Sequence, residues 1–193
     1  MDFNPLINKV KEIITNPVQA WENIKHDTDD KQEILIKFAL PLIVLGSFTT
    51  FIGSASFGLG HSTYIGFMSA IAYFISCIAG IYISAVVINE LAPNFGSEKD
   101  LDKAFKLVIY SSSASFLATI VSSLHPMLSF VGLFGLYSIY IFWLGVKPMM
   151  NTPEDKKLGF VVISALIIIT IIFLLNLILT SILIATPLAN VVM

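Results

Sequence analysis

The sequence predicts an all-α polytopic membrane protein, in which a short amphipathic cytoplasmic segment precedes a bundle of five transmembrane helices. The first observation is composition: of 193 residues, 56% are hydrophobic and 12% are charged, against about 45–50% and about 25% in soluble domains. The second is a series of long apolar runs, and the third is that the charges gather between alternate runs. Together they exclude a soluble domain, a disordered chain and a disulfide scaffold.

Five apolar runs are long enough to cross a bilayer, which takes about 20 mostly apolar residues in a helix. They cover about residues 34–52, 63–91, 104–124, 127–146 and 159–185. Only His125 and Pro126 separate the third run from the fourth. Because a proline disfavours helix in the residue before it, we expect a tight helical hairpin there. The chain then divides into an N-terminal segment, 1–33, and a five-span domain, 34–193.

The charges predict the orientation of the bundle. They lie in segments 1–33, 92–103 and 147–158 or at the adjoining span ends, whereas segments 53–62 and 186–193 carry none. With five spans, all 11 basic residues, every one a lysine, fall on one side. By the positive-inside rule this side is cytoplasmic, which places the N-terminus inside and the C-terminus outside. The absence of arginine argues against a nucleic-acid partner.

The first 33 residues contain two amphipathic patterns. Apolar residues between Leu6 and Ile14 follow helical spacing, and Asn16 and Pro17 resemble a helix cap and first helical position. Trp21 lies on the apolar face of the second pattern. Two arrangements fit, and both can hold together: the helices lie on the membrane with Trp21 as an interface anchor at headgroup depth, and their apolar faces pack on the cytoplasmic end of the bundle.

Small residues recur every four positions in the second and third spans. The candidate helix-packing positions are Ala72, Ser76, Gly80 and Ser84 in the second span, and Ser111, Ser115 and Thr119 in the third. In lipid, small residues at this spacing let helices approach closely, so we predict tight packing between spans two and three. The alternative is a polar lining for a solute or ion path.

Two further residues are candidates for such a polar path. Glu90 lies at the cytoplasmic end of the second span, where a solvated interfacial acid is the simpler interpretation and a cation- or proton-binding carboxylate the other. Asn176 lies well inside the fifth span. Its default role is an interhelical hydrogen bond, and its alternative role is to line a pore.

No motif predicts catalysis, a metal site or a cofactor. The sequence lacks a phosphate-binding glycine loop, a His-Glu-x-x-His pair and a nucleophile elbow. The single cysteine, Cys77, lies in an apolar run. The outer side carries no acid to complete a Ser–His pair there. We therefore expect no enzyme and no resident cofactor.

Three segments resemble the Yip domain family of five-span membrane proteins, in particular its bacterial members. Segment 16–24 (NPVQAWENI), after the short helical stretch 5–14, is similar to the family's opening; segments 145–150 (GVKPMM) and 153–160 (PEDKKLGF) resemble its fourth-span exit and loop. Where family members often carry a proline after a tyrosine in the third span, Tyr110 is followed here by three serines. Any kink at this point would come from serine hydroxyls bonding back to the helix.

The resemblance implies a membrane protein of the bacterial inner membrane whose partners are the lipid bilayer and other membrane proteins or further copies of itself. Eukaryotic relatives are associated with Rab GTPases, and Rab-type GTPase binding is not transferred to this chain. We expect a non-enzymatic scaffold or assembly partner acting through its cytoplasmic face. The alternative is a small-solute or ion transporter or channel that uses Glu90, the third-span hydroxyls and Asn176.

Overall fold

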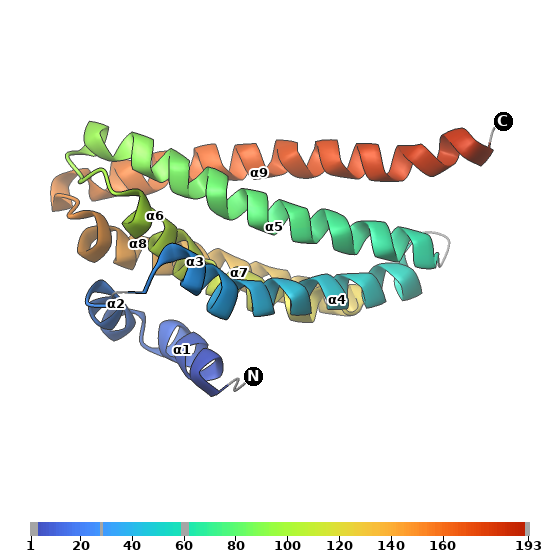
Figure 1. Ribbon diagram of the computed structural model, residues 1–193, viewed down its shortest axis with the longest axis horizontal. Helices are drawn as coiled ribbons and strands as arrows, with labels where there is room; N and C mark the ends of the chain where they lie inside the picture. The colour runs from blue at the N-terminus through green and yellow to red at the C-terminus, as the bar shows by residue number, and fades with distance from the viewer. Residues whose placement is uncertain (1–3, 28, 59–61, 192–193) are drawn as a thin grey trace.

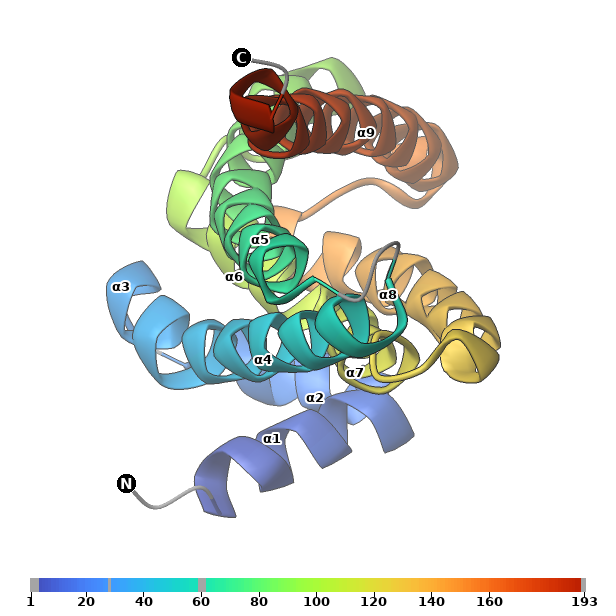
Figure 2. The same ribbon diagram turned by 90° about the vertical axis from the view of Figure 1, so that its right-hand side faces the viewer.

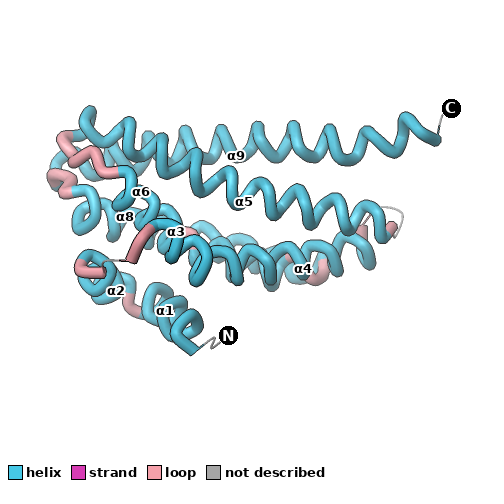
Figure 3. The backbone as a smooth tube through the Cα atoms, viewed as in Figure 1, coloured by secondary structure: helices cyan, strands magenta, loops and turns pink. Residues whose placement is uncertain are grey.

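The computed structural model describes residues 4–27, 29–58 and 62–191, with residue 180 and residues 182–191 described by their backbone only. The described residues form helices joined by short loops and contain no strand (Figure 3). In chain order they are α1 (Asn4–Thr15), α2 (Pro17–Lys25), α3 (Lys31–Ile34), the π-helix η1 (Leu35–Ala39), α4 (Leu40–Phe57), α5 (Thr63–Leu91), the 3₁₀-helix η2 (Ala92–Phe95), α6 (Leu101–Ser111), α7 (Ser113–Ser122), the 3₁₀-helix η3 (Pro126–Leu136), α8 (Tyr137–Met150) and α9 (Glu154–Val191).

Five stretches of helix are long and apolar enough to cross a membrane, as the sequence predicts. They are Lys31–Phe57, Thr63–Phe95, Leu101–Ser122, Pro126–Met150 and Glu154–Leu179. Each includes most of one predicted run. The fifth helix continues to Val191, so the segment from residue 186, expected as a tail, is helical as far as the structure describes it. The predicted hairpin is a turn at Ser123–His125 between α7 and η3.

The loops between α5 and α6 and between α8 and α9 lie at one end of the bundle (Figure 1). We call this the charged end, because these loops and their borders carry most of the ion pairs. The end of α4, the start of α5 and the turn from α7 to η3 lie at the opposite, uncharged end (Figure 1). Helices α1 and α2 flank one side of the bundle and α9 the other, in both views (Figures 1 and 2).

The first span contains a π-turn at η1, immediately before Pro41. A proline inside a helix cannot donate a backbone hydrogen bond, and its ring clashes with the carbonyl four residues earlier. Here the amide of Leu40 donates to the carbonyl of Leu35, five residues back, which is the hydrogen bond of a π-turn. The widened turn therefore lets the helix pass through Pro41 and continue to Phe57.

The third span is interrupted at Ser112, between α6 and α7. The hydroxyls of Ser111 and Ser112 both donate to the carbonyl of Val108, at 3.1 and 2.8 Å, and Ser113 donates to the carbonyl of Tyr110 at 2.6 Å. The serines after Tyr110 therefore bond back to the helix, which is the origin expected for a kink at this point.

The fourth span begins as an 11-residue 3₁₀-helix, a length that is uncommon because side chains three residues apart eclipse one another. The eclipsed column here consists of small residues, Ser129, Gly132 and Gly135, followed by Ser138. A Cβ at Gly132 would lie 3.8 Å from Ser122, and one at Gly135 would lie 3.5 Å from Ser115. The column thus lies along α7 and brings η3 close to it.

Candidate functional site

Trp21 is held inside the bundle. Its side chain is 2% exposed, and its indole Nε1 donates a hydrogen bond of 2.9 Å to the carbonyl of Ile141 in α8. A Cβ at Gly145, one turn further along α8, would lie 2.4 Å from Cε2 of the ring. The indole ring can therefore pack against α8 only because Gly145 has no side chain. The ring is thus surrounded by protein, as in the second of the two arrangements that the sequence allows, and its depth relative to the lipid headgroups stays a prediction.

The rest of the N-terminal pair is fixed to the same side of the bundle. Val10 and Ile13 of α1 and Ala20 and Ile24 of α2 are buried, and the hydroxyl of Tyr137 donates to the carbonyl of Ile14. Of the two arrangements that the sequence allows, the structure has the apolar faces packed on the bundle. Asn16 precedes α2 as its cap residue, as expected, but its side chain makes no capping hydrogen bond.

Asp27 connects this pair to the bundle. Its carboxylate forms an ion pair with Lys9 at 3.4 Å, and its backbone carbonyl accepts from Lys106 of α6 at 2.5 Å. The Lys9 ammonium also lies 5.7 Å from the centre of the Tyr110 ring, within the range of a cation–π contact. Helices α1, α2 and α6 therefore meet around one acidic residue.

The two loops of the charged end bind each other. The hydroxyls of Ser97 and Thr152, both buried, are 2.8 Å apart, and the amide of Glu98 donates to the carbonyl of Met150 at 2.9 Å. The Asn151 side chain and the Lys103 ammonium both stabilise the charged form of Glu98 and hold the pKa of its carboxyl below its usual value. These contacts join the α5–α6 and α8–α9 connections into one surface, which we call the loop clasp (residues 96–103 and 150–154).

Glu90 belongs to this charged end. Its side chain is 59% exposed and forms an ion pair of 2.7 Å with Lys99. It also accepts from Asn89 at 3.4 Å. Glu90 is therefore a solvated acid in an ion pair, which agrees with the simpler of the two interpretations of the sequence.

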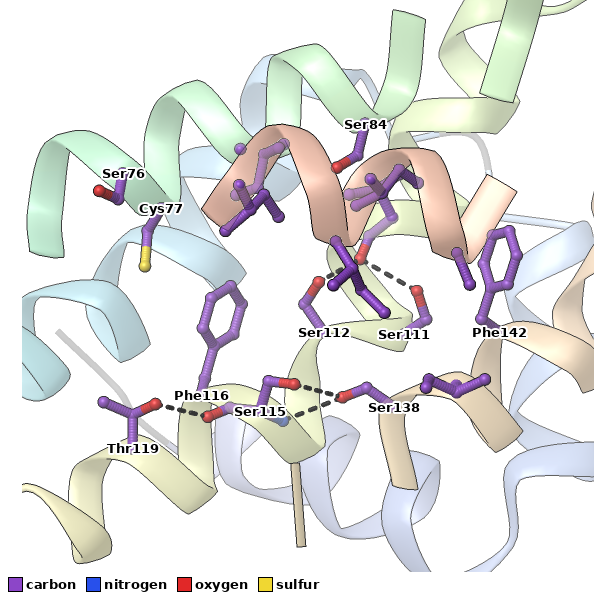
Figure 4. A pocket seen from close by; sticks show the side chains of 18 of the residues that line it. Ser76, Cys77, Ser84, Ser111, Ser112, Ser115, Phe116, Thr119, Ser138 and Phe142 are labelled. Carbon is purple, nitrogen blue, oxygen red and sulfur yellow. Dashed lines mark hydrogen bonds between the residues drawn. The ribbon is translucent and has the colours of Figure 1, made fainter. Parts of the chain in front are cut away.

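A cavity of about 380 Å³ lies between α5, α6, α7, α8 and α9 (Figure 4). Its polar lining residues are Tyr73, Ser76, Cys77, Ser84, Ser111, Ser112, Ser115, Thr119, Ser138 and Asn176. The remaining lining is apolar, and Glu90 is not part of it. The structure therefore brings Asn176 together with hydroxyls of the second and third spans but leaves Glu90 apart from them.

Ser138 joins α7 to α8 at the wall of this cavity. Its hydroxyl accepts a hydrogen bond of 3.0 Å from the amide of Ser115, one of the first-turn donors of α7 that have no partner within the helix. The two serine hydroxyls are 2.9 Å apart, and that of Ser115 donates to the carbonyl of Gly135 at 3.1 Å (Figure 4). Sequence reasoning missed Ser138, because it considered small residues spaced by four, whereas Ser138 continues a column spaced by three that begins in the 3₁₀-helix η3.

The small-residue rows have other partners than the ones predicted. Ser115 lies against Gly135 of η3, and Gly80 of α5 lies against Ile172 of α9. Ser76 donates to the Asn176 side chain at 3.1 Å, which gives Asn176 its expected interhelical hydrogen bond. The predicted tight packing against the second span is therefore wrong for Ser115 and Thr119, because α7 packs on η3 and α4. The row of small residues on α5 faces α9 and the cavity. Only the α6 half of the third span packs along α5.

The described residues contain no group of three or more His, Cys, Asp or Glu side chains placed to hold a metal ion. The lining of the cavity is uncharged. The polar groups of this chain are thus arranged for hydrogen bonding inside the bundle and for ion pairing at its charged end.

Comparison with known proteins supports the resemblance of the sequence. The family model of the Yip1 domain matches residues 11–177, from the first helix into the fifth span. No curated protein and no solved structure matches the chain. The matched region includes the buried Trp21, the loop clasp and the whole lining of the cavity, and this integral membrane protein therefore belongs to the Yip1 domain family.

Proposed function

We propose that the protein is a non-enzymatic membrane scaffold that binds partner proteins, or further copies of itself, on its cytoplasmic face, through the surface of the docked α1–α2 pair. The observation that carries the proposal is the docked α1–α2 pair. Its buried side is fixed to α8 by Trp21, and its other side holds Ile7 and Val18 each 59% exposed. Exposed apolar residues surrounded by charged ones resemble the apolar core and polar rim of a protein interface.

The rigidity of this surface supports the same role. The loop clasp and the ion pair between Lys31 and Asp102, at 2.8 Å, connect segments that lie far apart in the sequence. A surface held in one conformation loses less conformational entropy when a partner binds. The distribution of lysines supports a cytoplasmic location for this face by the positive-inside rule.

Site-specific photocrosslinking in cells tests the proposal. A photoreactive amino acid replaces Ile7 or Val18, with Phe48 as the matched control, because Phe48 is equally exposed but lies in the apolar α4. We expect discrete protein adducts at positions 7 and 18, including adducts of twice the protomer mass if copies associate, and none at 48. Lipid adducts alone at positions 7 and 18, or no adduct there, would overturn the scaffold role.

The hydroxyl-lined cavity is the observation that favours the alternative, a small-solute or ion transporter. Against it, Glu90 is paired with Lys99 outside the cavity lining, so no acid stands in the path. Liposome flux assays with the wild type and the Glu90→Gln and Asn176→Leu variants discriminate the two functions. We expect no flux above that of protein-free liposomes; flux that falls in the Asn176→Leu variant would establish transport instead.

A further inference from the structure

The hydrogen bonds of the cavity leave one hydroxyl without a partner. The hydroxyls of Ser111, Ser112 and Thr119 each donate to a backbone carbonyl of their own helix. Ser115 and Ser138 bond to each other. Ser84 alone among the serines of the lining makes no hydrogen bond in the described part of the chain, although it is only 4% exposed.

Ser84 points into the cavity from α5, opposite Ser111 and Ser112 of the third span (Figure 4). Its hydroxyl is not among the fully enclosed atoms without a partner, because it opens into the cavity, so a molecule in the cavity can supply the hydrogen bond that the protein does not. The Ser84 hydroxyl can both donate and accept a hydrogen bond. The hydroxyls of Ser111 and Ser112 already donate to backbone carbonyls and can therefore only accept further hydrogen bonds. A ligand hydroxyl satisfies both sides, since it accepts from Ser84 and donates to one of the opposite serines.

The remaining walls fit a hydrocarbon chain. Apolar side chains such as Ile81, Phe116 and Phe142 line the cavity, and no charged side chain does. Its volume of about 380 Å³ lies within the range of small-molecule sites, roughly 300–1,000 Å³. A phosphate or carboxylate headgroup would find no cation here, so the lining selects an uncharged ligand.

The cavity has an opening on the side of the bundle. Ile139 of α8 and Ile169 of α9 both line it, yet they are 40% and 55% exposed. Ser84 lies seven residues before the end of α5, which is about 10 Å of helix from the charged end. A lipid can therefore enter between α8 and α9 without leaving the bilayer, with its polar group about 10 Å from the charged end.

We propose that this cavity binds one uncharged lipid that ends in a hydroxyl group, with the hydroxyl held between Ser84 and the serines at the junction of α6 and α7. The chain of the lipid lies along the apolar walls and emerges between α8 and α9. This site is independent of the proposed scaffold role, because its lining shares no residue with the α1–α2 surface.

Photolabelling of the full chain in phosphatidylcholine nanodiscs tests the proposal. The probe is a long-chain alcohol with a diazirine in its chain, and its methyl ether, which cannot donate a hydrogen bond, is the matched probe. We expect saturable labelling of α5, α8 or α9 by the alcohol, and weaker labelling by the ether. Ser84→Ala should weaken labelling by the alcohol about three- to tenfold, as expected for one lost hydrogen bond.

Two variants separate binding from folding. Ser47→Ala removes a hydroxyl that donates to its own helix at the carbonyl of Ile43, outside the cavity, and should leave labelling unchanged. Gly80→Leu places a side chain in the cavity, where a Cβ finds only Ile172 at 3.7 Å, and should abolish labelling while the protein remains folded. Equal labelling by alcohol and ether, labelling unaffected by Ser84→Ala, or no saturable labelling of the folded wild type would overturn the proposal.

Discussion

The Trp21 indole lies so close to Gly145 that a methyl group at residue 145 would stand 2.4 Å from its Cε2 atom. The same ring donates a hydrogen bond to the carbonyl of Ile141, 120 residues away in the chain. One aromatic side chain thus fixes the N-terminal helices to the fourth span. The orientation of the proposed partner-binding surface depends on this contact.

Gly145→Ala should release the N-terminal helices from α8. The added methyl group overlaps the Trp21 ring, and such overpacking costs typically about 1–3 kcal/mol. Faster trypsin cleavage after Lys11 or Lys25 in detergent measures the release. The matched control is Gly80→Ala, whose methyl group would meet only Ile172 at 3.7 Å. Equal cleavage of the two variants would contradict the assignment.

Ser138→Ala should destabilise the junction between α7 and α8. It removes the acceptor of the Ser115 amide, and a buried donor left unpaired costs about 1–3 kcal/mol. Thermal or denaturant unfolding of the purified protein measures the loss. Ser181→Ala, which removes an exposed hydroxyl bonded to its own helix, should leave stability nearly unchanged. A Ser138→Ala protein as stable as that control would show that the amide finds another partner.

The loop clasp should loosen in acid. Because the Asn151 side chain and the Lys103 ammonium lower the pKa of Glu98 in the folded protein, its carboxylate stabilises the fold at neutral pH. That contribution is lost as the pH falls below the ordinary glutamate value of 4.5 and through the lowered pKa. The melting temperature of Glu98→Gln should therefore be lower than that of the wild type at pH 7 and converge with it in acid.

The control for this pH effect is Glu22→Gln. Glu22 is exposed on α2 and has no polar partner among the described residues. The difference in melting temperature between this variant and the wild type should not change with pH. A Glu98→Gln protein that follows the wild type at every pH would remove Glu98 from the clasp.

The two ends of the bundle should face different compartments. In a Cys77→Ala background, a membrane-impermeant maleimide added outside intact cells should label Thr63→Cys at the start of α5. Lys99→Cys, in the loop clasp, should react only after permeabilisation, because the positive-inside rule predicts a cytoplasmic location for the lysine-rich end. Labelling of Lys99→Cys in intact cells would reverse the orientation.

Much of the fold follows from the sequence. Hydropathy alone locates the five spans, because the bilayer requires about 20 apolar residues for each crossing. The second predicted span, 63–91, has the bounds of α5. The third span is interrupted at the three serines after Tyr110, where the sequence allowed a kink only through serine hydroxyls, and these hydroxyl-to-carbonyl bonds are local, spanning three or four residues.

The candidate site follows from the sequence only in part. The spacing of Ser76, Gly80 and Ser84 indicates that a helix or ligand comes close, but it carries no information about which one. Asn176 is correctly expected to form a hydrogen bond between helices. The sequence does not show, however, that Glu90 lies outside the cavity, because that depends on where along α5 the other helices pack. Such facts depend on contacts between residues distant in the chain.

By itself the sequence determined the class of the protein, its number of spans and the concentration of its charges at alternate connections, because these depend on composition and on local periodicity. Only the tertiary structure decided that Trp21 is buried against Gly145, that the small-residue row of α7 meets η3, and that Ser84 faces a cavity without a partner. The physical reason is that lipid offers every apolar helix face the same solvent. Which faces meet is therefore decided by the fit of side chains and hydrogen bonds among all the helices at once.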